Sequence, residues 1–128
     1  MRCGPATTLR AQRGAETAAQ QAAESWLALV DAGKYRESWT EAAQLFKDRV
    51  TIEQWESAVR AARTPLGKIG SRKLKVASYR KTLPGAPDGE YVVIQYETSF
   101  EKKRSALETI TPMKCDDGRW RVSGYYIK

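Results

Sequence analysis

The chain has 128 residues, with 22 Lys and Arg against 15 Asp and Glu, and it contains no histidine. A chain of this length forms one domain that can bury a core without disulfides or metals. The lack of histidine excludes a His-containing catalytic triad and a His-anchored metal centre, and two cysteines cannot build a zinc cluster. We therefore expect no cofactor and no metal. The sequence neither indicates nor excludes a disulfide between Cys3 and Cys115. No apolar run approaches the length of a membrane span.

The positive charge is unevenly distributed along the chain. Residues 1–66 hold nine basic and eight acidic side chains, a net charge of +1, whereas residues 67–128 hold thirteen and seven, a net charge of +6. Such an excess can attract nucleic acid, anionic lipid or acidic partners. The simpler explanation is a solvated surface, and no nucleic-acid motif accompanies the charge. We expect no nucleic-acid binding.

The first fourteen residues are predicted to form a flexible segment, followed by a single domain over residues 15–128. The segment lacks the apolar core that a signal peptide needs. It could equally stand where a signal was removed, so the compartment stays open.

Hydrophobic periodicity predicts three helices in the first half. The first begins near Ala15, carries an apolar stripe through Trp26 and ends at Gly33. The second runs from about Tyr35 to Phe46, with apolar residues on one face.

The third helix has the clearest start signal. Thr51 is the expected N-cap, Gln54 completes a capping box and Val50 can pack on Trp55. Its buried face is predicted to contain Ile52, Trp55, Val59 and Ala62, and the helix is predicted to end before Thr64.

The second half of the chain predicts four antiparallel strands. Alternating segments occupy about residues 71–81, 90–100, 105–111 and 119–127. The first strand should place Leu74, Val76 and Ser78 on one face. The residues expected to face the helices are Val92, Ile94, Tyr96, Thr98 and Phe100 on the second strand. On the last strand they are Trp120, Val122, Gly124 and Tyr126. The predicted fold is α+β, with three N-terminal helices packed on a curved four-stranded antiparallel sheet.

Several motifs together resemble one family, the domain-of-unknown-function family numbered 4019, over roughly residues 18–127. They are Trp26–Tyr35, Ser38–Trp39, Pro65–Gly67, Ser71–Arg72, Leu83–Tyr91 and Asp117–Ile127. The order of three helices before a curved sheet is that of the cone-shaped nuclear transport factor 2-like fold. The resemblance implies that fold, and it implies bacterial proteins that are often exported, although no signal peptide is present. The family name carries no activity.

The orientation of Glu108 depends on one turn. A three-residue loop over Asp116–Gly118 pairs Glu108 with Tyr126 and points it toward the helices. A two-residue turn sends it outward, opposite Ile127. We favour the three-residue loop because it places Ile110 on the inner face.

The candidate site is a cavity between the helices and the sheet. An unpaired carboxylate buried there would cost several kcal/mol or have a raised pKa. Arg72 is a candidate partner for Glu108, and Tyr96 or Tyr126 could donate a hydrogen bond. A polar anchor or a general base is one interpretation, and a structural ion pair is the other. The candidate ligand-binding residues are Glu108, Arg72, Tyr96, Tyr126 and Trp120.

We interpret the protein as a non-catalytic binding or interaction module, with a small ligand in the cone or a protein on the outer face of the sheet. The alternative is a cofactor-free acid–base enzyme that uses Glu108 with tyrosines, which rests on fold analogy. A homodimer through the sheet could use the outer-face residues Tyr91, Val93, Tyr125 and Ile127.

Overall fold

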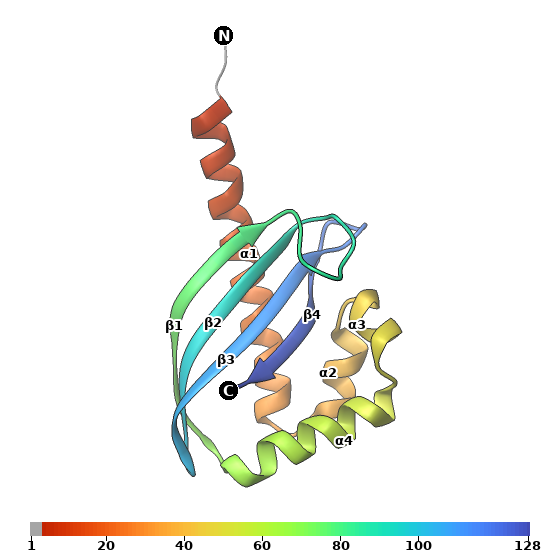
Figure 1. Cartoon of the computed structure of the whole chain (residues 1–128), viewed down its shortest axis with the longest axis vertical. Coiled ribbons are helices and arrows are strands. Elements are labelled where there is room, and N and C mark those ends of the chain that lie inside the picture. The colour runs from red at the N-terminus through yellow and green to blue at the C-terminus, as the bar shows by residue number, and fades with distance from the viewer. Residues whose placement is uncertain (1–3) are drawn as a thin grey trace.

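The computed structural model describes residues 4–128, and their side chains from residue 10 onward. Over this range, helices precede a single antiparallel sheet with the strand order β1-β2-β3-β4 (Figure 1). The helices are α1 (Gly4–Asp31), α2 (Tyr35–Glu41), α3 (Gln44–Arg49) and α4 (Ile52–Arg63), followed by a 3₁₀ turn (Thr64–Leu66). The strands are β1 (Ile69–Arg80), β2 (Tyr91–Phe100), β3 (Lys103–Lys114) and β4 (Trp120–Ile127). The α+β class and the four-stranded meander are confirmed.

Helix α1 begins earlier than predicted. It starts at Gly4 rather than near Ala15, and its first turns project beyond the sheet (Figure 1). Gly14 does not interrupt the helix, since an internal glycine costs only about 1 kcal/mol relative to alanine. The helix stops as expected at Gly33, which has a φ of 76°. Met1–Cys3 lie outside the described residues, so the question of a disulfide between Cys3 and Cys115 lies outside them as well.

The predicted second helix is two helices, so the described chain has four α-helices instead of three. Ala42 and Ala43, between α2 and α3, are extended, with ψ angles of 165° and 153°. The Ala43 N–H donates to the carbonyl of Val122 in β4 at 2.8 Å. In a continuous helix the Ala43 N–H would donate to a carbonyl one turn earlier in the helix, but here it donates to the sheet. A tertiary contact therefore overrides the local helical pattern.

Helix α4 confirms its predicted start. The Gln54 N–H donates to Thr51 Oγ1 at 3.1 Å, and the Thr51 N–H donates to Gln54 Oε1 at 2.9 Å. Trp55 and Val59 are buried as expected. Ala62 is exposed, contrary to the prediction, and Arg63 is buried in its place. The buried positions therefore follow a spacing of four along the helix.

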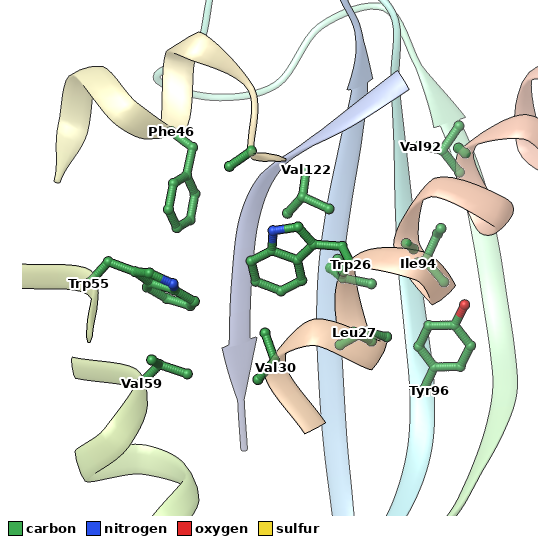
Figure 2. Packing of buried hydrophobic residues seen from close by; sticks show 14 residues of the cluster. Trp26, Leu27, Val30, Phe46, Trp55, Val59, Val92, Ile94, Tyr96 and Val122 are labelled. Atoms are coloured by element: carbon green, nitrogen blue, oxygen red, sulfur yellow. The ribbon is translucent and has the colours of Figure 1, made fainter. Parts of the chain in front are cut away.

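Aromatic side chains fill the space between the helices and the sheet (Figure 2). The rings of Trp26 and Trp55 lie 5.7 Å apart, and Phe46 packs edge-on to Trp55 at 5.0 Å. Both indole N–H groups are satisfied on one residue, because Trp26 donates to the Ser38 carbonyl and Trp55 to the Ser38 hydroxyl. On the sheet, the predicted inner residues of β2 are all buried: Val92, Ile94, Tyr96, Thr98 and Phe100.

A bulge at Lys75 changes the faces of β1. Leu74 pairs with Tyr96, but Val76 pairs with Gln95, so Lys75 is an extra residue. Beyond the bulge, Tyr79 packs toward the core and Val76 lies on the outer face. The prediction that Leu74, Val76 and Ser78 share one face is therefore wrong after Leu74.

A second bulge changes the faces of β4. The three-residue loop is confirmed, because the Cys115 N–H donates to the Arg119 carbonyl at 2.8 Å. Farther along, Pro112 pairs with Val122 but Thr111 pairs with Gly124, which leaves Ser123 as the extra residue. Pro112 has no N–H to give the ladder, which suits a bulge.

The shift moves Tyr125 onto the inner face of β4, where it packs against the core, and moves Gly124 and Tyr126 off it. Both of the latter were expected inside. Glu108 pairs with Ile127 and not with Tyr126.

Candidate functional site

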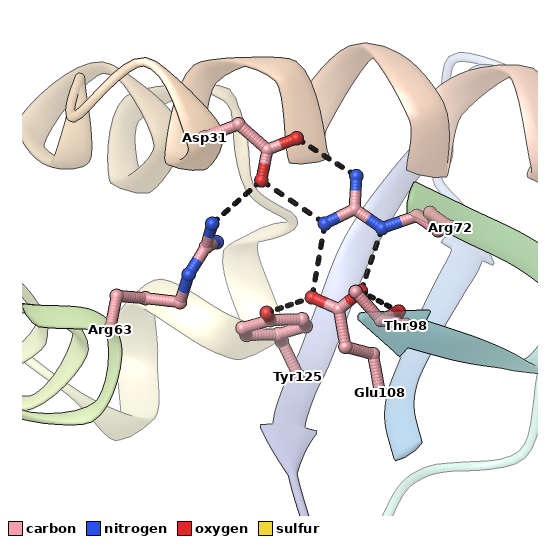
Figure 3. Close-up of polar contacts among 6 residues, drawn as sticks. All are labelled: Asp31, Arg63, Arg72, Thr98, Glu108 and Tyr125. Atoms are coloured by element: carbon pink, nitrogen blue, oxygen red, sulfur yellow. Dashed lines mark hydrogen bonds and ion pairs between the residues drawn. The ribbon is translucent and has the colours of Figure 1, made fainter. Parts of the chain in front are cut away.

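Glu108 of β3 lies at the centre of a buried polar network (Figure 3). Its side chain is completely enclosed, with 0% of its surface exposed. Oε1 accepts hydrogen bonds from Arg72 Nε at 2.6 Å and from Thr98 Oγ1 at 2.5 Å. Oε2 accepts from Arg72 Nη2 at 3.1 Å and from the Tyr125 hydroxyl. Each oxygen therefore receives two donors, which uses the full acceptor capacity of a carboxylate.

Arg72 of β1 joins this carboxylate to helix α1. Its Nη1 donates to Asp31 Oδ2 at 2.8 Å, and its Nη2 donates to Asp31 Oδ1 at 3.0 Å. Asp31 is the last residue of α1. The planar guanidinium lies between two carboxylates and makes a two-point contact with each, the geometry that suits arginine. The pair of contacts ties the sheet to the end of the helix.

Arg63, at the end of α4, completes the network. Its Nη2 donates to Asp31 Oδ1 at 2.9 Å, and its guanidinium lies 4.9 Å from the Phe100 ring centre. Arg63, Asp31, Arg72 and Glu108 thus alternate in sign and sum to zero charge. Arg63 Nε and Nη1 are buried without a hydrogen-bond partner among the described residues. We call Asp31, Arg63, Arg72, Thr98, Glu108 and Tyr125 the buried charge network.

The surroundings shift the pKa of several members. Burial alone would raise the pKa of Asp31, but the hydrogen bonds and charges of Arg72 and then Arg63 outweigh it and leave this pKa lowered. Burial would lower the pKa of Arg72, and its bonds to Asp31 and Glu108 reverse that and raise it. Burial, the charge of Glu108 and the hydrogen bond to it raise the pKa of the Tyr125 phenol. These groups therefore keep their ordinary charge states at neutral pH.

Tyr96 lies across from Glu108 but does not join the network. Its hydroxyl is buried without a hydrogen-bond partner among the described residues. Burial, together with the negative charge of Glu24, raises its pKa to about 12. The phenol therefore stays protonated at neutral pH.

The space around Glu108 is filled by side chains. Trp26 packs on the Tyr125 ring at 5.3 Å, and Trp55 packs on it at 6.5 Å. Hollows on the described surface include five of about 360 to 610 Å³, and Glu108 lines none of these five. The hollow of about 360 Å³ lies between α1 and β4 and includes Trp120.

The predicted site residues therefore separate into two groups. Glu108 and Arg72 are in contact, and Tyr96 is their buried neighbour. Tyr126 is 55% exposed and points away from them, because the bulge in β4 reverses its face. Trp120 is half-buried beside the hollow between α1 and β4.

Sequence reasoning assigned no site role to the other four members of the buried charge network, Asp31, Arg63, Thr98 and Tyr125. For Asp31 and Arg63, the spacing of buried residues along their helices could have indicated a buried position. Asp31 continues the four-residue spacing of buried Ala23 and Leu27 on α1, and Arg63 continues that of Trp55 and Val59 on α4. Thr98 was expected on the inner face without a role. Tyr125 could not be assigned to the interior from the sequence, because only the bulge in β4 turns its side chain inward.

The proposed dimer residues also change. Tyr91 is completely buried, and its hydroxyl donates to the Pro87 carbonyl at 2.6 Å. Tyr125 faces the core. Ile127 pairs with the inward-facing Glu108, so the bulge turns it to the inner side as well. Three of the four residues are therefore not on an open outer face.

The described residues contain no group of three or more Cys, Asp or Glu side chains arranged to hold a metal ion. None of the helices described here combines the length and the apolar character needed to cross a membrane.

The fold and the site define a small α+β domain, in which helices pack on a four-stranded antiparallel sheet around a buried charge network. Residues 22–125 match the family described as Protein of unknown function (DUF4019). Because the match spans more than half of the chain, the protein belongs to this family. No curated protein and no solved structure matches the chain.

Proposed function

We propose that this domain is a non-catalytic binding or interaction module that contacts its partner through its surface. The observation that supports the proposal is the saturation of Glu108. Both of its oxygens already accept two hydrogen bonds, and no part of the side chain is exposed. The hydrogen-bonding capacity of Glu108 is thus used entirely by other residues of the domain.

The alternative, a cofactor-free acid–base enzyme, would need a carboxylate that exchanges a proton with a substrate. Such a group requires a free acceptor position and a path to solvent. Glu108 meets neither requirement, because it is fully enclosed and both of its oxygens already accept hydrogen bonds from Arg72 and its neighbours. The phenol of Tyr125 points at Glu108, so it offers no proton to a bound molecule.

The placement of the helices on one face of the sheet also supports the proposal of a nuclear transport factor 2-like fold. In such a cone a ligand would be expected between the helices and the sheet, and here aromatic rings occupy that space. A small ligand would instead find room in the hollow between α1 and β4, beside Trp120. A homodimer through the outer face of the sheet stays a further proposal.

The test of the proposed function is Glu108→Gln. Glutamine keeps the shape but presents an amide N–H₂ where the arginine, threonine and tyrosine all donate. We expect a loss of about 3 kcal/mol in the free energy of unfolding, measured by urea denaturation, because a buried ion pair loses one partner. Glu97→Gln, at an exposed position on β2, is the matched control and should stay within about 0.5 kcal/mol of the parent.

A carboxylate kept for catalysis gives the opposite result. Functional groups are commonly held at a cost in stability, and their removal often stabilises a protein. An unchanged or more stable Glu108→Gln protein would contradict the proposal and favour the enzyme.

A further inference from the structure

The outer edge of β1 is a free strand edge. β1 pairs only with β2, and it lies at the margin of the sheet with no element beyond it (Figure 1). Among residues 4–128, no other segment donates or accepts a backbone hydrogen bond at β1. The opposite edge differs, since the Ala43 N–H covers β4 at Val122. A twelve-residue strand thus keeps one row of backbone groups unpaired.

The free edge carries exposed apolar side chains. Leu74 and Val76 are each 44% exposed, and they are two of the three large hydrophobic residues that are exposed among the described side chains. Leu74 lies on the inner side of the strand and Val76 on the outer side, separated by the bulged Lys75. Apolar surface of this kind is available to a partner.

A basic hollow adjoins the same edge. On the outer face, about 470 Å³ is lined by residues that include Lys73, Lys75, Arg104 and Lys128. None of these four forms an ion pair with a described residue, although Glu97 lies opposite Lys73 across the sheet. We call residues 73–76 together with this hollow the β1 edge surface.

The charge decides which occupant fits. If two copies of the chain paired along β1, Lys73 and Lys75 of one copy would approach those of the other, and like charges would oppose the pairing. An acidic segment from a different protein meets no such repulsion. In an added strand, alternate side chains point to opposite faces. Acidic residues would then meet the lysines outside while apolar residues meet Leu74 inside.

We propose that the β1 edge surface binds an extended acidic segment of a partner protein, which adds to the sheet as a fifth strand. Main-chain hydrogen bonds supply affinity in this mode, and the side-chain pattern supplies specificity. The lysines serve two purposes, since they repel a second copy and attract the acidic partner. This inference rests on the proposed function and specifies its surface and partner.

The test uses a synthetic peptide of about twelve residues with alternating glutamate and valine, which matches the length of β1. Binding is followed by fluorescence anisotropy, and its position by amide NMR shifts. We expect shifts centred on residues 69–80, together with slower amide exchange along that strand. Lys73→Glu with Lys75→Glu should weaken binding by at least about tenfold. Arg13→Glu with Lys34→Glu makes the same change in net charge elsewhere, and it should leave the affinity within about twofold.

A second peptide separates strand addition from simple charge attraction. Methylation of alternate backbone nitrogens keeps the charges but removes the hydrogen bonds that an added strand needs. We expect this peptide to bind at least about tenfold more weakly. Equal binding of the methylated peptide would overturn the proposal. Tighter binding of a single-stranded oligonucleotide or of anionic lipid vesicles would also overturn it.

The remaining outcomes separate this inference from the proposed function. Amide shifts at the hollow between α1 and β4, and not at β1, would overturn the edge site and leave a surface-binding module in place. Absence of peptide binding at millimolar concentration would overturn the acidic-strand partner alone. Only a Glu108→Gln protein as stable as the parent would contradict the proposed function itself.

Discussion

Arg72 and Lys73 are neighbours on β1, yet their charges have opposite surroundings. The Arg72 side chain lies between the carboxylates of Asp31 and Glu108, whereas Lys73 is exposed and forms no ion pair with a described residue. Strand alternation alone separates them. The comparison shows that neighbouring basic residues on one strand can have two different roles. Its inward charge holds the fold together, and its outward charges remain available to a partner.

The largest expected effect removes the inner charge. Arg72→Met leaves the buried Glu108 without its ion-pair partner and leaves Asp31 with Arg63 alone, and we expect a loss of about 3–5 kcal/mol in the free energy of unfolding. Lys73→Met on the same strand should change it by less than about 0.5 kcal/mol. Urea denaturation of both variants measures the difference. Equal effects at the two positions would show that the comparison is wrong.

The next effect separates two adjacent tyrosines on β4. Tyr125→Phe keeps the ring against Trp26 but removes a hydrogen bond to the charged Glu108, so we expect a loss of about 1.5–3 kcal/mol. Tyr126→Phe, at the exposed position, should lose less than about 0.5 kcal/mol. Thermal and urea unfolding give both values. The reverse order would mean that the bulge in β4 is not present in solution.

The inner charges should also make stability depend on pH. The pKa of Asp31 is lowered in the folded protein, chiefly because the bonds and charge of Arg72 outweigh the effect of burial. Its contribution is therefore fully present above the ordinary value of about 3.9 and is lost as the pH falls below it. We expect the free energy of unfolding to fall from about pH 4 downward, and Asp31→Asn should flatten that fall. An identical acid profile in the variant would contradict this role.

The smallest expected effect concerns the exposed lysines of β1. Reversal of both exposed lysines, Lys73→Glu with Lys75→Glu, should leave the free energy of unfolding within about 0.5 kcal/mol of the parent. These charges have no described partner, and the change reduces a net charge of +7. A loss of more than about 1 kcal/mol, measured by urea denaturation, would assign the lysines a structural role.

Much of the fold follows from local sequence signals. The capping box at Thr51, the stop at Gly33 and the three-residue loop ending at Gly118 each depend on neighbouring residues only. The alternation on β2 also sorts its side chains correctly, because that strand has no bulge over its central residues. Such signals need no knowledge of what packs against them.

The departures come from contacts that are distant in the sequence. The break between α2 and α3 depends on the bond from Ala43 to Val122, and the bulges at Lys75 and Ser123 depend on pairing with other strands. Each bulge reverses the faces of all the residues beyond it. That reversal exchanges Tyr126 for Tyr125, so one extra residue alters the predicted site.

The centre of the site was predicted in part. A carboxylate on the inner face of β3 requires a cation, and Arg72 was the inner-facing cation available on β1. The prediction stopped at a pair because it assigned no role to Asp31 or Arg63, which lie at the ends of α1 and α4. In the structure these ends meet at the pair and complete its charge balance.

The most direct test of the central claim is a double-mutant cycle between Arg72 and Glu108. Arg72→Met and Glu108→Met each leave an unbalanced buried charge, while the double variant leaves Asp31 balanced by Arg63. We predict that the double variant is more stable than the sum of the single losses implies, with a coupling free energy of at least about 2 kcal/mol in urea denaturation. Losses that add within about 0.5 kcal/mol would contradict the account, because they would show that the two charges do not depend on each other in the folded protein.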